Sequence, residues 1–517
     1  MTQEAIIEQI SIELSFNISN VSNTVQLLAD GNTVPFISRY RKEITGNLSE
    51  IDVRDINYWF NSLTTLYEHK DQIIRLIKEQ DKLTPALREA ISKCKSVAQV
   101  EDIYAPFKKK RKTKSDIAKE NGLEPLSELI LEFDQTDPEK LASDYVNNKV
   151  TDSFEAFKGA VEIIAEKIGH DLETKGLVKD SFTSSEINIK ISDDVDKNDP
   201  KVLVYKDYFD YNESVTTLAP HRLLAINREE KEKILKLKID IHDKEQVISQ
   251  IKEKFKPENA TTSPLEKYYN RAIDLAYSKF LAPSNKAEIW RNQKVLAFKD
   301  AINVFSKNLE SLLLTPPVSG YTILGIDPGF RTGCKTAIIS PLGKVIYTGV
   351  LYLTSQSKEN DSLKELESLL DEYNITLMSI GDGTASRETE EIVSNSQKRK
   401  SLNIPYLIVT EAGASVYSAS EVASTEFPEL DVSLRGTISI ARRVQDPLAE
   451  YVKIDPWSIG VGQYQHDLPQ NELKLALMQT VESVVNRVGV ELNSASPQLL
   501  SYVSGVSTSQ AKAIYSY

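Results

Sequence analysis

The chain has 517 residues, of which 40% are hydrophobic and 26% charged, and its formal net charge is −13. This length exceeds what one core can hold, so three or four domains are expected, and the acidic balance argues against a protein that coats nucleic acid or membrane indiscriminately. No segment is apolar for long enough to span a membrane, and residues 1–20 lack the basic start and apolar centre of a secretion signal, so we expect a cytoplasmic protein. Only two cysteines and five unclustered histidines occur, which argues against a disulfide framework or a structural zinc site.

The first three-fifths of the chain is predicted to be mostly helical. From Ser49 onward, apolar residues recur at helical spacing, and Ser49 with Asp52 forms the signature of a capping box. Another amphipathic helix is predicted to begin near Asp152 and to stop at Gly169. Further helices are predicted over residues 229–237, 264–280 and 287–314.

The densest basic run follows Tyr104 and Phe107 and consists of Lys108, Lys109, Lys110, Arg111 and Lys112. A cationic run with aromatic neighbours is suited to contact the phosphates of a nucleic acid. A solvated loop between two helices gives the same pattern, and the sequence leaves both interpretations open.

After Pro316 and Pro317 the hydrophobic period changes, and strands begin to alternate with helices. Three strands come first, and then each of two further strands is followed by helical segments. The strands are predicted at 321–326, 336–340, 345–352, 376–381 and 405–410, and the helices at 359–372 and from about 385, 413 and 433. Three antiparallel strands followed by this alternation is the element order of an RNase H-like fold.

Four carboxylates fall where such a fold builds an acidic site. Asp327 ends the first strand, Asp382 follows the fourth, Glu411 ends the last, and Asp446 lies on the terminal helix. Converging carboxylates repel one another and favour a divalent cation, so Asp327, Glu411 and Asp446 are candidate ligands for Mg²⁺ or Mn²⁺. Each also has a structural interpretation: Asp327 in an Asp-Pro-Gly turn, Asp382 and Glu411 at helix N-termini, and Asp446 as an N-cap before Pro447.

The segment from 499 to 514 has the pattern of a helix-hairpin-helix. Apolar residues flank a tight turn at Gly505, and the second helix is predicted to begin between Ser507 and Ser509. Such turns bind phosphates through backbone N–H groups without reading sequence, which makes Ser504, Gly505, Ser507 and Lys512 candidate nucleic-acid contacts. An ordinary pair of antiparallel helices is the alternative.

With these motifs the chain resembles the Tex family of bacterial transcription accessory proteins, which is related to the eukaryotic elongation factor Spt-six. The matching motifs run along nearly the whole chain and include VPFISRYRKEITGNL (34–48), YAPFKKKRKTKSDIAKENGLEPL (104–126), HRLLAINREE (221–230), GIDPGFRTGCK (325–335), GDGTASRETE (381–390), EAGAS (411–415), ARRVQDPLAEYVKIDP (441–456) and VNRVGVELNSASPQLLSYVSGV (485–506).

The resemblance implies a multidomain, mainly α protein with an embedded α/β RNase H-like domain of YqgF type and a C-terminal helix-hairpin-helix. The implied domains are an N-terminal helical domain (1–190), a central helical region (191–316), the YqgF/RNase H-like domain (317–455) and an incomplete helix-hairpin-helix region (456–517). The family also implies a second hairpin and a C-terminal OB-fold RNA-binding domain. Because the chain stops at Tyr517, we expect a fragment that lacks both.

Two features of the acidic site bear on activity. Asp382 stands where relatives commonly carry an amide, so it adds a carboxylate. Arg331, Arg442 and Arg443 lie close in sequence to the acidic candidates, and they can either bind phosphate or neutralise the carboxylates.

We therefore favour a transcription accessory factor that binds RNA or DNA without sequence preference, acts with RNA polymerase or the transcription machinery, and has a non-catalytic RNase H-like domain. The alternative is a metal-dependent nuclease or resolvase using Asp327, Glu411 and Asp446, with or without Asp382. A third interpretation, a structural helical adaptor for RNA polymerase, fits the acidic charge but leaves the hairpin unexplained.

Overall fold

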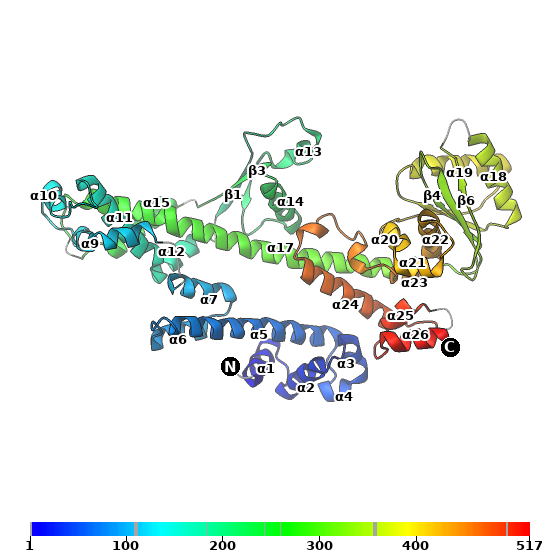
Figure 1. Cartoon of the computed structure of the whole chain (residues 1–517), viewed down its shortest axis with the longest axis horizontal. Coiled ribbons are helices and arrows are strands. Elements are labelled where there is room, and N and C mark those ends of the chain that lie inside the picture. Colours follow the sequence, from blue (N-terminus) through cyan, green and yellow to red (C-terminus); the bar gives the residue numbers. More distant parts are fainter. Residues whose placement is uncertain are drawn as a thin grey trace. The chain divides into compact units, whose positions relative to one another are not determined.

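The computed structural model describes residues 3–107, 112–182, 185–241, 243–258, 260–354, 359–492 and 495–517 (Figure 1). The chain divides into two compact units: residues 1–104 and 302–517 form unit 1, and residues 105–301 form unit 2. Helices dominate both units, as the sequence predicts. Throughout the described ranges, no helix has both the length and the apolar character needed to cross a membrane. The division into four domains stays a prediction.

Unit 2 is built around α11 (Ser153–His170), which packs along α16 (Glu266–Ala276). Asp152 caps α11 as predicted, because its carboxylate accepts a hydrogen bond from the Glu155 N–H at 2.8 Å. Gly169 does not end the helix. A Cβ there would lie 2.6 Å from Cβ of Phe280, so the glycine lets α11 approach the π-helical turn at Tyr277–Leu281.

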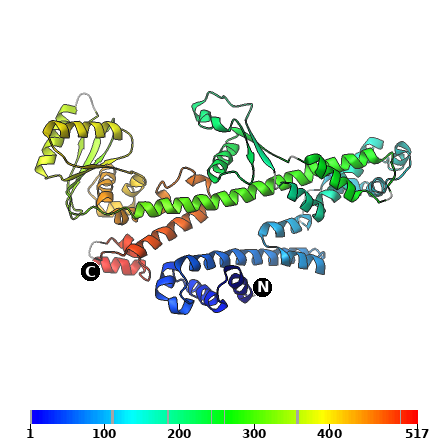
Figure 2. The same cartoon turned by 180° about the vertical axis from the view of Figure 1, so that it is seen from behind.

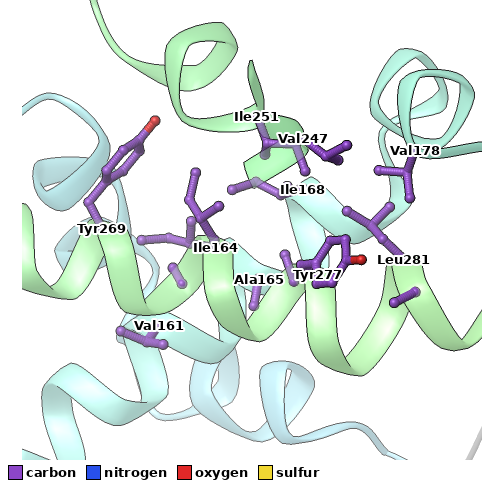
Figure 3. Close-up of a cluster of buried hydrophobic side chains, with 14 of the residues drawn as sticks. Val161, Ile164, Ala165, Ile168, Val178, Val247, Ile251, Tyr269, Tyr277 and Leu281 are labelled. Atoms are coloured by element: carbon purple, nitrogen blue, oxygen red, sulfur yellow. The ribbon is translucent and has the colours of Figure 1, made fainter. Parts of the chain in front are cut away.

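The core of unit 2 joins α11 and α16 to α12 (Leu172–Phe182) and α15 (Lys244–Phe255). Figure 3 shows side chains from these helices and the π-helical turn meeting in one cluster: Val161, Ile164, Ala165, Ile168, Val178, Val247, Ile251, Tyr269, Tyr277 and Leu281. The other helices of this unit are α8 (Lys114–Glu120), α9 (Glu124–Leu131), α10 (Pro138–Ser143), α13 (Pro200–Leu203), α14 (Pro220–Lys231) and the first part of α17 (Ala282–Leu313).

Unit 2 also contains an antiparallel sheet that the sequence analysis missed. Its strand order is β2 (Asp210–Ser214), β1 (Glu186–Ile191), β3 (Leu235–Asp240). The helix predicted over 229–237 is therefore wrong, since α14 ends at Lys231 and β3 begins at Leu235. In β3, Leu235, Leu237 and Ile239 alternate with lysines, which is the period of a half-buried strand.

The N-terminal part of unit 1 is organised by α5 (Glu50–Lys78). The predicted capping box is confirmed: the Ser49 hydroxyl accepts from the Asp52 N–H at 3.2 Å, and the Asp52 carboxylate accepts from the Ser49 N–H at 2.7 Å. The apolar face of α5 is buried, as its spacing predicts. The surrounding helices are α1 (Gln3–Leu14), α2 (Ile18–Ala29), α3 (Val34–Tyr40), α4 (Lys42–Thr45), α6 (Pro85–Lys93) and α7 (Val97–Tyr104).

The predicted RNase H-like domain follows in unit 1. Its sheet has the order β6 (Val345–Leu351), β5 (Cys334–Ile339), β4 (Ile323–Asp327), β7 (Leu377–Gly381), β8 (Tyr406–Val409). The β6–β5–β4 pairings are antiparallel and the β4–β7–β8 pairings parallel, as the element order predicts.

Helices cover both faces of this sheet, and Figure 1 and Figure 2 show the domain from opposite sides. Leucines of α18 (Glu359–Glu372) and Val393 of α19 (Ser386–Lys400) pack on one face. Ala441 and Val444 of α22 (Val432–Gln445) pack on the other. Three short helices flank α22: α20 (Ala414–Ser418), α21 (Glu421–Glu426) and α23 (Pro447–Tyr451).

Unit 1 ends in α24 (Gln470–Val488), α25 (Pro497–Ser501) and α26 (Thr508–Ser516). α25 and α26 pack against each other across the turn at 502–507, and α26 begins where the sequence predicts. The fold class is thus confirmed: the protein is mainly α, with an embedded α/β domain and a C-terminal helical hairpin.

Candidate functional site

Three of the four acidic candidates lie at one edge of the five-stranded sheet. Because β4, β7 and β8 are parallel, their C-terminal ends meet at that edge. Asp327 is the last residue of β4, Asp382 directly follows β7, and Glu411 follows β8 by two residues. Open α/β sheets bind ligands at such edges.

The strand pattern turns Asp327 toward the face that α22 covers. Residues two apart in a strand share a face, and Ile323 packs with Ala441 of α22. Gly325 is next on that face. A Cβ on Gly325 would lie 2.8 Å from Cβ of Ala441, so the glycine permits close contact between α22 and β4. Asp327 then borders a hollow that it shares with Glu411 and the first turns of α22.

The carboxyl groups of Asp327 and Glu411 lie close enough at the hollow to influence each other's pKa. Burial, followed by the nearby charge of Asp327, raises the pKa of Glu411 to about 7. Burial also raises the pKa of Asp327, and the opposing effect of Lys335 is smaller. The pair therefore holds a proton well above the pH at which isolated carboxyls lose theirs.

Two glycines make room for the Glu411 side chain. A Cβ on Gly381 would lie 2.1 Å from Oε1 of Glu411, and a Cβ on Gly383 would lie 2.2 Å from Oε2. The Gly383 N–H donates to Oε1 at 3.1 Å. Asp382 holds the backbone of the same residue, because its Oδ1 accepts from the Glu411 N–H at 2.9 Å. The segment 381–383, at the end of β7, thus leaves room for the Glu411 side chain and forms hydrogen bonds with Glu411.

The structure does not bring Asp446 to this edge. α22 begins beside the acidic pair and crosses the sheet, and Gln445 near its end donates to the Pro341 carbonyl in the β5–β6 turn at 2.8 Å. Because α22 has 14 residues and a helix rises about 1.5 Å per residue, Asp446 at its far end lies about 20 Å from the start of the helix beside the acidic pair. Its structural interpretation holds instead: Asp446 caps α23 by accepting from the Ala449 N–H at 3.0 Å, with Pro447 at the first helical position.

The acidic residue that lines the hollow from α22 is Asp431, which the sequence analysis did not single out. It caps α22 by accepting from the Ser433 N–H at 2.9 Å and the Ser433 hydroxyl at 2.6 Å, and the Ser433 hydroxyl bond is the main reason that its pKa is lowered. An Asp just before the helix predicted from 433 was the available signal.

The structure places Asp446 away from Asp327 and Glu411, so it does not bring together the three ligands predicted for Mg²⁺ or Mn²⁺. Among the residues that the structure describes, no three His, Cys, Asp or Glu side chains converge closely enough to hold a metal ion. Asp431, the other acidic residue that lines the hollow, is engaged as the N-cap of α22. Metal binding by these residues stays a prediction.

The three arginines near the site have different surroundings. Arg443 is only 3% exposed, donates to the Thr410 carbonyl at the end of β8, and lies 4.7 Å from the ring centre of Tyr451. Arg442 donates to the Gly343 carbonyl in the β5–β6 turn, while Arg331 is exposed. Buried Arg443 therefore links α22 to the end of β8 through a hydrogen bond.

A buried ion network supports the helices on this side of the sheet. The Lys453 ammonium lies 2.6 Å from Glu450 and 2.9 Å from Glu426, and the side chains of Lys453 and Glu450 are only 5% and 4% exposed. The Ser439 hydroxyl of α22 donates to Glu450 at 3.1 Å. These interactions join α21, α22 and α23.

The turn predicted at Gly505 is present between α25 and α26, and phosphate binding by it stays a prediction. Gly505 has φ +90, a conformation that favours glycine. The Ser504 N–H donates to Asn486 Oδ1 at 2.8 Å, and Ser507 caps α26 in a capping box with Gln510. Within the described part of the chain, the Gly505 N–H has no acceptor. Lys512 is exposed on α26.

The basic run lies mostly outside the described residues, which resume at Lys112. There the ammonium group of Lys112 pairs with the Glu120 carboxylate at 2.7 Å, and both side chains are exposed. Phosphate contact by this run stays a prediction.

Four family models match the chain. They are the Tex-like protein N-terminal domain at 4–78, the Tex central region-like domain at 134–305, the Tex protein YqgF-like domain at 321–445, and the helix-hairpin-helix motif at 485–517. YdcI of Bacillus subtilis is 42% identical over 99% of this chain and 71% of its own length. The transcriptional accessory protein Tex of Neisseria gonorrhoeae is 40% identical over 98% of this chain and 67% of its own.

The chain belongs to the Tex family. The similarity extends to the human S1 RNA-binding domain-containing protein 1, which is 35% identical over 95% of this chain and 51% of its own length. The Tex YqgF-like match contains Asp327, Glu411 and Asp431 but ends before Asp446. The helix-hairpin-helix match contains both Asn486 and Gly505.

Proposed function

We propose that this Tex-family chain is a transcription accessory factor that binds RNA or DNA without sequence preference and whose RNase H-like domain is not catalytic. A relative named a transcriptional accessory protein and another named for an RNA-binding domain support the first part. RNA polymerase or its associated machinery is the proposed protein partner, and the cytoplasm the proposed location.

The observation that carries the binding proposal is the hairpin turn at Gly505, within the helix-hairpin-helix match. Gly505 is exposed and has a positive φ, and its N–H has no acceptor in the described part of the chain. Backbone N–H groups of this kind bind phosphate oxygens and read no base, so affinity should fall steeply with salt.

The non-catalytic proposal rests on the acidic pair. A two-metal nuclease needs carboxylates that hold two cations about 3.5–4 Å apart. Among the described residues no three Asp, Glu, His or Cys side chains are grouped to hold even one metal ion, and Asp431 is used as an N-cap. In this arrangement the cluster stabilises the sheet edge instead of presenting ligands.

The binding proposal is tested with Gly505→Val and a control at another glycine of similar conformation. Gly320 has φ +85 with no atom within 4 Å of a Cβ there, so Gly320→Val imposes similar backbone strain away from the hairpin. Forcing a left-handed conformation on a non-glycine residue costs about 1–2 kcal/mol, equivalent to about a five- to thirtyfold change in affinity. We expect Gly505→Val to weaken binding to a labelled oligonucleotide at low salt and Gly320→Val to leave it unchanged. Unchanged binding by a folded Gly505→Val variant would refute the hairpin's role.

A metal-dependent nuclease is the second candidate, because the hollow beside α22 is lined by Asp327, Glu411 and Asp431. If the site were catalytic, Asp431→Asn would abolish cleavage, whereas Asp446→Asn, which lies at the far end of α22, would retain it. The opposite dependence would contradict a nuclease site built at this edge.

A further inference from the structure

In unit 1, the N-terminal helix α3 packs against α24 and lies beside the hairpin turn. A Cβ on Gly505 would lie 3.5 Å from Cε2 of Phe36, which is ordinary van der Waals contact. The Arg39 guanidinium donates to the backbone carbonyl of Asn486 near the end of α24. Ser483 of α24 also donates to Glu50 at the start of α5. Segments that lie more than 400 residues apart in sequence thus form one surface.

Asn486 fixes the hairpin turn relative to this surface. Its side-chain amide donates to the Tyr502 carbonyl at 2.8 Å, and its side-chain oxygen accepts from the Ser504 N–H at 2.8 Å. The same residue receives Arg39 on its backbone carbonyl. The Asn486 side chain therefore holds the turn through two hydrogen bonds, and the Asn486 backbone carbonyl links α24 to α3.

The exposed groups beside the turn are aromatic and cationic. Tyr40 is 58% exposed, and its ring lies 5.4 Å from that of Phe36. The Arg41 guanidinium lies 4.8 Å from the centre of the Phe36 ring. Phe36 thus lies beside the turn, and the Arg41 guanidinium lies over its ring. Lys42 is also exposed, and with Glu43 the 34–45 segment has three cations and one carboxylate, a formal charge of 3 − 1 = +2 in a chain of −13.

This combination has the chemistry of a site for single-stranded nucleic acid. Such sites pair cations that follow the phosphates with exposed aromatic rings on which unpaired bases stack. A duplex hides its base faces and leaves an exposed tyrosine ring without a partner of this kind.

We propose that α3, α4 and the hairpin turn at 503–507 form one binding surface for a single strand of RNA or DNA, in which the turn and Arg41 contact phosphates and Tyr40 stacks on a base. The proposal rests on the function proposed above, because it extends the phosphate-binding turn to a second element. Asn486 acts as a positioning residue and makes no direct contact.

Fluorescence anisotropy of the full chain with labelled oligo-dT and oligo-U of twenty nucleotides tests the proposal across a range of salt concentrations. We expect Tyr40→Ala to weaken binding about tenfold and Tyr40→Trp, which keeps a stacking ring, to bind like the unmodified protein. Arg41→Gln should reduce the slope of log affinity against log salt by about 0.7, the value for one phosphate contact to a single strand. Arg75→Gln, at an exposed site on α5, is the control and should change neither quantity.

The outcomes separate the two proposals. If Gly505→Val weakens binding while Tyr40→Ala and Arg41→Gln do not, the hairpin acts alone and the shared surface is refuted, although the proposed function stands. If Gly505→Val and the milder Gly505→Ala both bind normally in folded protein, both proposals fail. If Tyr40→Ala weakens duplex and single-strand binding equally, stacking on an unpaired base is refuted.

Discussion

Gly325 sets how closely α22 packs on the sheet, and replacing it tests the placement of Asp327. A Cβ at this position would lie 2.8 Å from Cβ of Ala441 and 3.1 Å from the backbone carbonyl of Thr437. Neither group is the end of a flexible side chain, so α22 or β4 must shift. Overpacking of this kind costs about 1–3 kcal/mol, and we expect Gly325→Ala to lower the free energy of unfolding of this domain by about 2 kcal/mol.

Gly436→Ala on the same helix is the matched control. A Cβ there would have no neighbour closer than 3.8 Å, and alanine is favoured over glycine inside a helix by about 0.5–1 kcal/mol, so this variant should stabilise the domain. Hydrogen exchange of peptides from β4 and α22 in the full chain measures both changes in this domain separately from the rest. A Gly325→Ala variant as stable as the unmodified protein would refute the close packing that turns Asp327 toward α22.

Three further predictions follow from the same domain. The pKa of Glu411 is raised to about 7 in the folded state, so its contribution to stability is complete below its ordinary pKa and is lost as pH rises through 7. The free energy of unfolding, measured by denaturation across this pH range, should therefore fall as pH rises. In Glu411→Gln this decrease should be smaller. Asp446→Ala removes the N-cap of α23 and should lower the free energy of unfolding in denaturant by about 1 kcal/mol, whereas Asp446→Ser keeps the cap. Neither variant should change oligonucleotide binding. Lys453→Met removes the closer of the two cations that pair with buried Glu450, since Arg442 stays at 3.8 Å, and should cost about 3 kcal/mol in the same measurement. A loss below 1 kcal/mol would contradict the buried network.

Local signals in the sequence predicted much of this fold. The Ser49–Asp52 capping box, the helix at 359–372 and the three antiparallel strands before the parallel pair are all present in the structure. These features depend on residues close together in sequence, where side-chain periodicity and capping chemistry determine the outcome. The carboxyl ends of parallel strands must meet at one edge, and this rule brought Asp327 and Glu411 together correctly.

Features that depend on distant partners could not be predicted in this way. Residues 235–240 show only a short alternation of apolar and charged residues, and they form β3 by pairing with β1 at 186–191. The acidic residue on α22 was assigned to the wrong end of the helix, since sequence gives the spacing of Asp431 and Asp446 but not which end meets the sheet edge. The bond from Arg39 to the Asn486 carbonyl places Phe36 beside Gly505, and no local pattern in the sequence signals it.

The central claim, a nucleic-acid-binding factor without nuclease activity, is tested most directly by binding and cleavage in one assay. The full chain is incubated with labelled single-stranded and four-way-junction substrates in Mg²⁺ or Mn²⁺, beside Asp327→Asn. The account predicts binding that falls steeply with salt, and no cleavage above that of Asp327→Asn. Metal-dependent cleavage by the unmodified protein that disappears in a folded Asp327→Asn variant with intact binding would contradict it.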